Sequence, residues 1–421
     1  MSIAENALQG VRAEWAEEST IGVPPTDPEW NNYSDYLDDG PGWSPAVNQS
    51  ENTPVGSGHI SHITRGAEDV HELTIAYWAQ RALVDGTGTV QDPIAYPFLH
   101  DYSEEYTSHT VVWRREVTSG GADGAGYRVY TVALGARPIS ATIPGDPGDA
   151  SPQSLELGYE AEYARTHRVD QPGSATTLDV VSSDDGDTNV DITIEDEGAA
   201  TTETITLNGT TAQTTTESFA DIDAVYVESG EPVGDITVSD GSGTTFATLQ
   251  GIDTNGVEAD VGIPTTGGGS HASDINNDPE RYLGLNTASS FGGGLLPPER
   301  VHQFDLAAEL GTDVNPKQGT RRVSIDIDTA TVTAEADVAG EDETTQQIES
   351  YLQGYSGDIT YALGGTSTGG GVTDITLQSA QVTDTDDQTY GAGDPNNIFA
   401  VVWTAQDSDF DGSVVSMTNT T

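Results

Sequence analysis

Apolar and polar residues alternate with period two along much of the chain, which is typical of half-buried β-strands. Residues 111–117, for example, place Val111 and Trp113 on one face of such a strand. The alternation predicts a first β block between residues 55 and 171. Its expected strands are 58–65, 70–78, 107–117, 127–142 and 154–169. Residues 77–84 could instead form a short helix that follows the second of these strands.

A second block of the same style is expected at residues 265–421. Residues 321–339 form a long alternating run with Val323, Ile325 and Ile327 on one face. Residues 341–354 predict the clearest helix of the chain, because acids occupy its first turn and a glycine ends it. Three further strands are expected in this block, at 356–363, 374–382 and 398–405.

The two blocks resemble each other in one local pattern. Each contains a strand, a polar Gly-Asp-Pro turn and a second strand, with the turns at Gly145 and Gly393. This pattern favours an internal duplication, although chance similarity in a chain rich in Gly and Asp is the alternative. The blocks are of ordinary domain size once the segment between them is set aside.

Two other segments differ from these blocks. Residues 172–264 contain no Lys or Arg and alternate in short strands with turns at close spacing, which predicts an immunoglobulin-like β-sandwich. Residues 170–173 and 264–269 are expected to be linkers. Residues 1–54 lack sustained periodicity and predict an extended N-terminal arm, with a short helix possible at 4–17 and with Trp15, Trp30 and Trp43 as anchors.

The charge balance of the chain indicates the kind of solvent in which we expect the protein to fold. The 421 residues include 69 acids and 14 bases, the net charge is −55, and Lys317 is the only lysine. Such a chain repels itself strongly in dilute buffer. At about 1 M ionic strength the Debye length falls to roughly 3 Å, so the repulsion is largely screened. We therefore expect a protein that requires high salt. Disorder is the alternative, against which stand six Trp, sixteen Tyr and the alternating runs.

Several classes of chemistry have no signal in the sequence. There is no cysteine, and the first residues show no secretory signal, so we expect synthesis in the cytoplasm. No apolar run is long enough to cross a membrane as a helix. The scarcity of Lys and Arg argues against specific binding of nucleic acid. No P-loop, zinc-protease or serine-hydrolase motif is present, so the sequence predicts no enzyme and no cofactor.

Calcium is the one ligand with a weak signal. Asp407, Asp409 and Asp411 alternate before Gly412, which is the front half of a calcium loop. The twelfth position is Thr418, where a bidentate Glu would be expected. Residues 185–191 also alternate, although a valine stands where the loop needs glycine. Solvated acidic turns are the alternative at both places.

Four stretches together resemble the tail tube (major tail) proteins of long-tailed viruses. Residues 11–25 are similar to the acidic lead into that family's arm, and residues 127–142 to its paired closing strands. Residues 301–311 with 321–325 resemble the opening of a second tube domain, and residues 203–211 with 218–226 are similar to the immunoglobulin-like decorations of virion proteins. With the charge, this resemblance points to a virus of a halophilic archaeon.

The resemblance implies a mainly β fold with two tandem tail-tube-type β-sandwich domains and an inserted immunoglobulin-like domain. It divides the chain into an arm (1–54), a first tube domain (55–171), an outer domain (172–264) and a second tube domain (265–421). Such domains form rings closed as a β-barrel, which stack into a tube. Two domains in a chain favour a homotrimer with pseudo-sixfold symmetry, while a homohexamer stays open.

The implied role is structural, in the tail of a virion assembled in the host cytoplasm. Rings would contact one another and other tail proteins, and viral DNA would pass through the channel without specific binding. Carboxylates that line the channel would repel phosphates, although every solvated face of a halophilic protein is acidic. A capsid decoration protein or a distal tail protein is the alternative.

Overall fold

The computed structural model describes most of the chain. The described residues are 11–25, 30–33, 42–44, 47–52, 62–68, 70–78, 83–85, 87–99, 107–145, 154–196, 201–252, 259–264, 288–291, 301–317, 322–339, 354, 356–363, 372–385, 398–406 and 414–420. Antiparallel strands dominate this part of the chain, so the prediction of a mainly β protein is confirmed. Its only helical element is the short 3-10 helix η2 (Pro93–Ala95).

Seven strands of the N-terminal half form what we call module 1. Strand β8 is central, and β9 and β10 follow each other along one of its edges. Strand β7 covers part of the other edge and pairs with β1, while β9 pairs with β6 and β6 with β3. The strands are β1 (Val11–Glu17), β3 (Gly42–Ser44), β6 (His71–Trp78), β7 (His109–Val117), β8 (Tyr127–Gly145), β9 (Ser154–Ala161) and β10 (Tyr163–Asp170).

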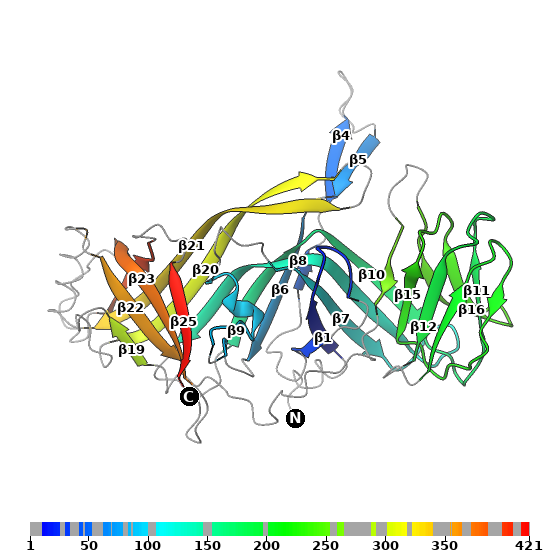
Figure 1. Cartoon of the computed structure of the whole chain (residues 1–421), viewed down its shortest axis with the longest axis horizontal. Coiled ribbons are helices and arrows are strands. Elements are labelled where there is room, and N and C mark those ends of the chain that lie inside the picture. The colour runs from blue at the N-terminus through cyan, green and yellow to red at the C-terminus, as the bar shows by residue number, and fades with distance from the viewer. Residues whose placement is uncertain are drawn as a thin grey trace.

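Three small strands accompany module 1. The two-residue strand β2 (Asn31–Asn32) pairs with β1. Strands β4 (Val47–Asn52) and β5 (His62–Glu68) pair with each other and extend the ladder of β3 and β6 away from the sheet. In Figure 1 this β4–β5 hairpin stands above the rest of the molecule.

Seven strands of the C-terminal part form module 2, at the left of Figure 1. Strand β23 is central, with β24 and β25 following each other along one edge and β22 along the other. Strand β22 pairs with β19, β24 with β21, and β21 with β20. The strands are β19 (Ala288–Phe291), β20 (Val301–Pro316), β21 (Val323–Ala339), β22 (Ser356–Leu363), β23 (Val372–Thr385), β24 (Ile398–Thr404) and β25 (Val415–Thr420).

The two modules have the same strand order. Module 1 runs β1-β7-β8-(β9, β10)-β6-β3, and module 2 runs β19-β22-β23-(β24, β25)-β21-β20. Equivalent strands also occur in the same order along the chain. This correspondence is what a duplication of one module would produce.

An outer sandwich of two four-stranded sheets lies at the right of Figure 1. One sheet has the order β14-β11-β16-β17 and the other β13-β12-β15-β18. The strands are β11 (Leu178–Ser182), β12 (Asp191–Glu195), β13 (Thr202–Thr206), β14 (Gln213–Thr214), β15 (Ala224–Ser229), β16 (Ile236–Asp240), β17 (Thr245–Leu249) and β18 (Gly262–Ile263).

Two hydrophobic cores hold these parts together, and β8 contributes to both. One core joins the two modules and includes Ile143 of β8, Leu306 of β20 and Ile375 of β23. The other core joins the sandwich to the opposite face of module 1 and includes Tyr130 and Val132 of β8. The sandwich and module 2 are therefore both packed on module 1.

Some expectations need correction. Residues Val11–Glu17 form strand β1 inside the sheet, so the helix predicted over 4–17 is wrong for these residues. Residues 170–173 are not a free linker, because Asp170 ends β10 and the side chain of Gln171 is buried. The described strands of one chain form an open sheet and no closed barrel. The helix predicted at 341–354 lies outside the described residues, apart from Gly354.

Candidate functional site

The joint between the modules is a strand pairing within one sheet. Strand β7 pairs with β8 only as far as Ala136, and beyond that point β20 takes the same edge of β8. The paired residues run from Phe304 opposite Gly145 to Glu309 opposite Ser140. Ladder hydrogen bonds therefore make the two modules one continuous sheet.

Apolar packing reinforces this joint. Leu306 lies opposite Ile143 in the register, and both side chains are fully buried. Complete burial of a side chain of this size stabilises the fold by about 1.5–3 kcal/mol. The ring of Phe304 stacks on Tyr361 of β22 at a centroid distance of 4.4 Å. A Cβ atom at Gly145 would lie 1.9 Å from the Tyr361 hydroxyl oxygen, so this close approach requires glycine.

The free end of the β20–β21 hairpin provides a second contact between the modules. Lys317 Nζ lies 2.8 Å from Oε2 of Glu162, whose side chain is 3% exposed. The Val323 N–H donates to the carbonyl oxygen of Glu162 at 3.2 Å. The guanidinium of Arg322 donates to the carbonyl oxygen of Gly22. The hairpin thus ends on the corner between β9 and β10, and the only lysine of the chain takes part in the contact.

This corner is itself fixed by a half-buried carboxylate, that of Glu18. Strand β8 bends at Gly135, which has a φ of 58°, a value that favours glycine. The Gly135 N–H donates to Oε1 of Glu18 at 2.9 Å, and the hydroxyls of Ser108 and Thr110 donate to the same carboxylate at 2.8 and 2.9 Å. Burial raises the pKa of Glu18, while these hydrogen bonds oppose the shift.

A buried ionic network fixes the outer sandwich on module 1. Asp223 Oδ1 lies 2.6 Å from Nη1 of Arg114 and 3.2 Å from Nη1 of Arg128. The hydroxyl of Tyr130 donates to the same oxygen at 2.7 Å, and burial raises the pKa of this phenol. The side chains of Asp223 and Arg128 are 2% and 4% exposed. Because these charges are out of water, removal of one partner would leave a buried charge uncompensated.

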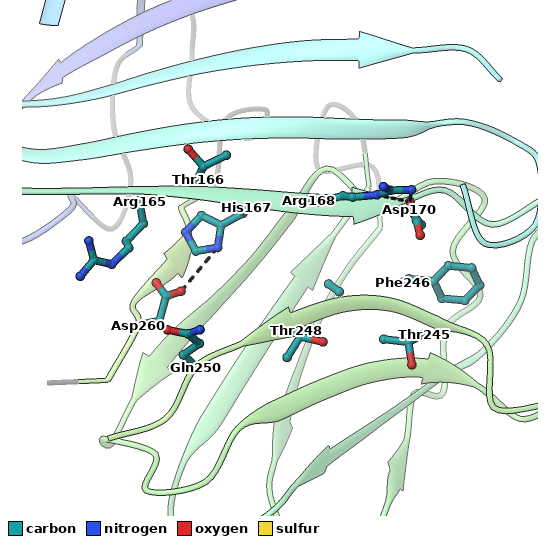
Figure 2. Close-up of a pocket in the computed structure, with 11 residues that line it drawn as sticks. Arg165, Thr166, His167, Arg168, Asp170, Thr245, Phe246, Thr248, Gln250 and Asp260 are labelled. Carbon is teal, nitrogen blue, oxygen red and sulfur yellow. Dashed lines mark hydrogen bonds and ion pairs between the residues drawn. The ribbon is translucent and has the colours of Figure 1, made fainter. Parts of the chain in front are cut away.

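A cleft of about 390 Å³ lies between β10 and β17, at the edge of this seam. Figure 2 shows that His167 points across the cleft toward Asp260, and their Nδ1 and Oδ2 atoms are 3.5 Å apart. Burial lowers the pKa of His167, so the ring is neutral at pH 7. Arg168 is paired with Asp170 at 2.9 Å. The cleft is thus a polar seam, with a neutral His167 facing Asp260 across it and the Arg168–Asp170 ion pair on β10.

The calcium predictions have different outcomes. Asp407, Asp409 and Asp411 lie outside the described residues, so calcium there stays a prediction. In the second loop Asp187 accepts hydrogen bonds from Ser182 and from the N–H groups of Val233 and Gly234. The hydrogen bonds of this carboxylate therefore join the loop to the segment at Val233 and Gly234. The described part of the chain contains no group of three or more acidic or His side chains that could bind a metal.

Comparison with known protein families found no family that matches this sequence, and a search of curated proteins found no match either. Among the described residues, no helix is long and apolar enough to cross a membrane.

Sequence reasoning found the strands of the joint but not their pairing. Residues 127–142 and 301–311 were both singled out, yet alternation does not say which strand edges meet. Glu18, Glu162 and Asp223 were missed because acids are common everywhere in this chain. The single lysine was the one available signal, since a residue used only once marks an unusual position.

Proposed function

We propose that this chain is the tail tube subunit of a long-tailed virus that infects a halophilic archaeon. In this role copies join into rings, the rings stack into a tube, and the tube provides the channel for the viral DNA. The observation that carries the proposal is the joint between β8 and β20, where two modules of the same strand order form one sheet.

The edges that remain open match this joint. In module 2, β22 pairs with β23 only as far as Gln381, as β7 pairs with β8 only as far as Ala136. Beyond these points β8 pairs with β20, whereas no described strand takes the corresponding edge of β23. Strand β3 is the module 1 counterpart of β20, and among the described strands it pairs only with β6.

Pairing between β23 of one copy and β3 of the next would repeat the internal joint. Repetition of one heterologous contact gives a closed ring when its rotation closes. Such a closed ring would also remove the open strand edges, which otherwise favour aggregation. Two modules in each chain favour three copies in each ring.

Charge is consistent with a channel for DNA. A net charge of −55 gives little electrostatic attraction for phosphates, and therefore favours passage over binding. It also favours assembly in high salt, where repulsion between copies is screened.

Electron microscopy and sedimentation of the purified protein in molar KCl test the proposal. We expect closed rings or stacked tubes with three copies in each ring. Six copies would keep the tube and reject pseudo-sixfold symmetry. A protein that stays monomeric at high concentration would reject the proposed function.

A further inference from the structure

The β4–β5 hairpin of module 1 corresponds to the outer part of the β20–β21 hairpin of module 2. Strand β3 continues into β4, and β5 into β6, so that module 1 also has one long hairpin. Each hairpin has a register shift that leaves an extra residue on its second strand. The shift lies between Val47 and Gln49 on the first strand of module 1, and between Gly311 and Thr312 on the first strand of module 2.

The pairing registers relate the two modules residue by residue. Strands β9 and β24 each lie between the central strand and the second strand of the hairpin. The equivalent positions are Gly158, which pairs with Ser140 and Thr74, and Val402, which pairs with Asp384 and Glu335.

This register identifies the counterparts of the internal hairpin contact. Glu162 stands four residues after Gly158 in module 1, and Gln406 stands four residues after Val402 in module 2. His62 stands twelve residues before Thr74 of β6, and Val323 stands twelve residues before Glu335 of β21. The Val323 N–H donates to the Glu162 carbonyl oxygen within the chain. The corresponding contact would join His62 to Gln406.

The contact between His62 and Gln406 requires a second copy. Within the chain, the hairpin of module 2 lies against module 1. By the same register, the hairpin of module 1 would lie against module 2 of another chain. The β4–β5 hairpin forms a two-stranded sheet of its own among the described strands. Isolated two-stranded hairpins are marginally stable in water, so a partner surface is expected.

We propose that the β4–β5 hairpin of one copy lies on the end of β24, at Gln406, of the next copy in the ring. This inference rests on the proposed function and adds a second contact to the sheet joint. Strand β3 pairs with β23 of the neighbour, and the hairpin beyond β3 clasps the same neighbour. Each copy would thus give one hairpin and receive one.

The absence of cysteine makes a crosslinking test direct. His62→Cys and Gln406→Cys are placed on separate chains, mixed in molar KCl and oxidised. A backbone contact like that of Val323 and Glu162 brings Cα atoms within the distance that a disulfide spans. We expect covalent dimers on a denaturing gel, and covalent rings when one chain carries both substitutions. The matched control combines His62→Cys with Ser242→Cys, which lies in an exposed turn of the outer sandwich.

Microscopy of the same samples separates the two proposals. Crosslinks at position 406 but not at position 242 support the hairpin contact. Rings that form without the crosslink overturn the hairpin contact and leave the proposed function standing. If the unsubstituted protein itself stays monomeric, both proposals fail.

Discussion

The two long hairpins occupy equivalent places in the two modules but have different surroundings. The β20–β21 hairpin ends on module 1, where Lys317 meets the carboxylate of Glu162. The β4–β5 hairpin pairs only within itself among the described strands. Under the proposed function, the single chain would contain both halves of an interface with its own copies, one used within the chain and one between chains.

The largest expected effect comes from a substitution in the internal joint between β8 and β20. Ala307 of β20 lies between Thr142 of β8 and Thr333 of β21, so both edges of the strand are paired. Proline cannot donate to a ladder and is confined to strand edges, so Ala307→Pro should destabilise the fold by about 3 kcal/mol or more. Urea unfolding in molar KCl measures this loss. Ala307→Val keeps the N–H group and should cost much less; equal effects of the two substitutions would contradict the joint.

A second large effect concerns the outer sandwich, which only module 1 carries. Asp223→Asn removes the buried carboxylate that Arg114 and Arg128 share, and we expect a loss of about 3 kcal/mol in the free energy of unfolding. The same urea titration measures it. Asp221→Asn is the matched control, because that carboxylate is 36% exposed and 3.7 Å from Arg128. A small effect at position 223 would mean that the sandwich is not fixed by this network.

The core of module 1 should also give the protein a pH dependence. His109 packs against Trp15 at a ring distance of 4.8 Å, and burial lowers its pKa to about 3. The unfolded chain binds a proton near pH 6.5, whereas the folded chain does not. Stability is therefore complete above pH 6.5 and falls by about 1.4 kcal/mol per pH unit as the pH drops toward 3.

His109→Phe should remove this part of the pH dependence. The described residues offer neither ring nitrogen a hydrogen-bond partner, so phenylalanine loses no bond there. The measurement is the difference in melting temperature between the variant and the unsubstituted protein from pH 7 to pH 5. A difference that does not change with pH would show that His109 takes up its proton as readily in the folded state as in the unfolded chain.

The smallest expected effect concerns the ion pair at the end of the β20–β21 hairpin. Lys317→Met removes the partner of the buried Glu162 carboxylate, but Lys317 is 41% exposed, so the loss should be only about 1 kcal/mol. Lys317→Arg keeps the charge and serves as the control. A double-mutant cycle with Glu162→Gln measures the coupling of the pair. Additive effects of the two substitutions would show that the hairpin end is held by its backbone contacts alone.

Strand prediction succeeded where alternation is regular and failed where packing decides. Strands β6, β7 and β8 agree with the expected runs to within a few residues, and β6 has the one buried face that strict alternation predicts. Strand β1 was expected to belong to an arm or a short helix. It is a strand because β7 offers it an open edge, and no local pattern reveals that edge.

The sequence by itself determined the β class and most of the segments that become strands, because alternation is a local property. Only the tertiary structure decided which edges meet. The bulge near Asp328 shows the reason: Val323 and Ile325 are buried before it, and Val332 and Ala334 after it, so the buried face changes parity. One extra residue reverses the faces of a strand, and its place depends on a distant partner.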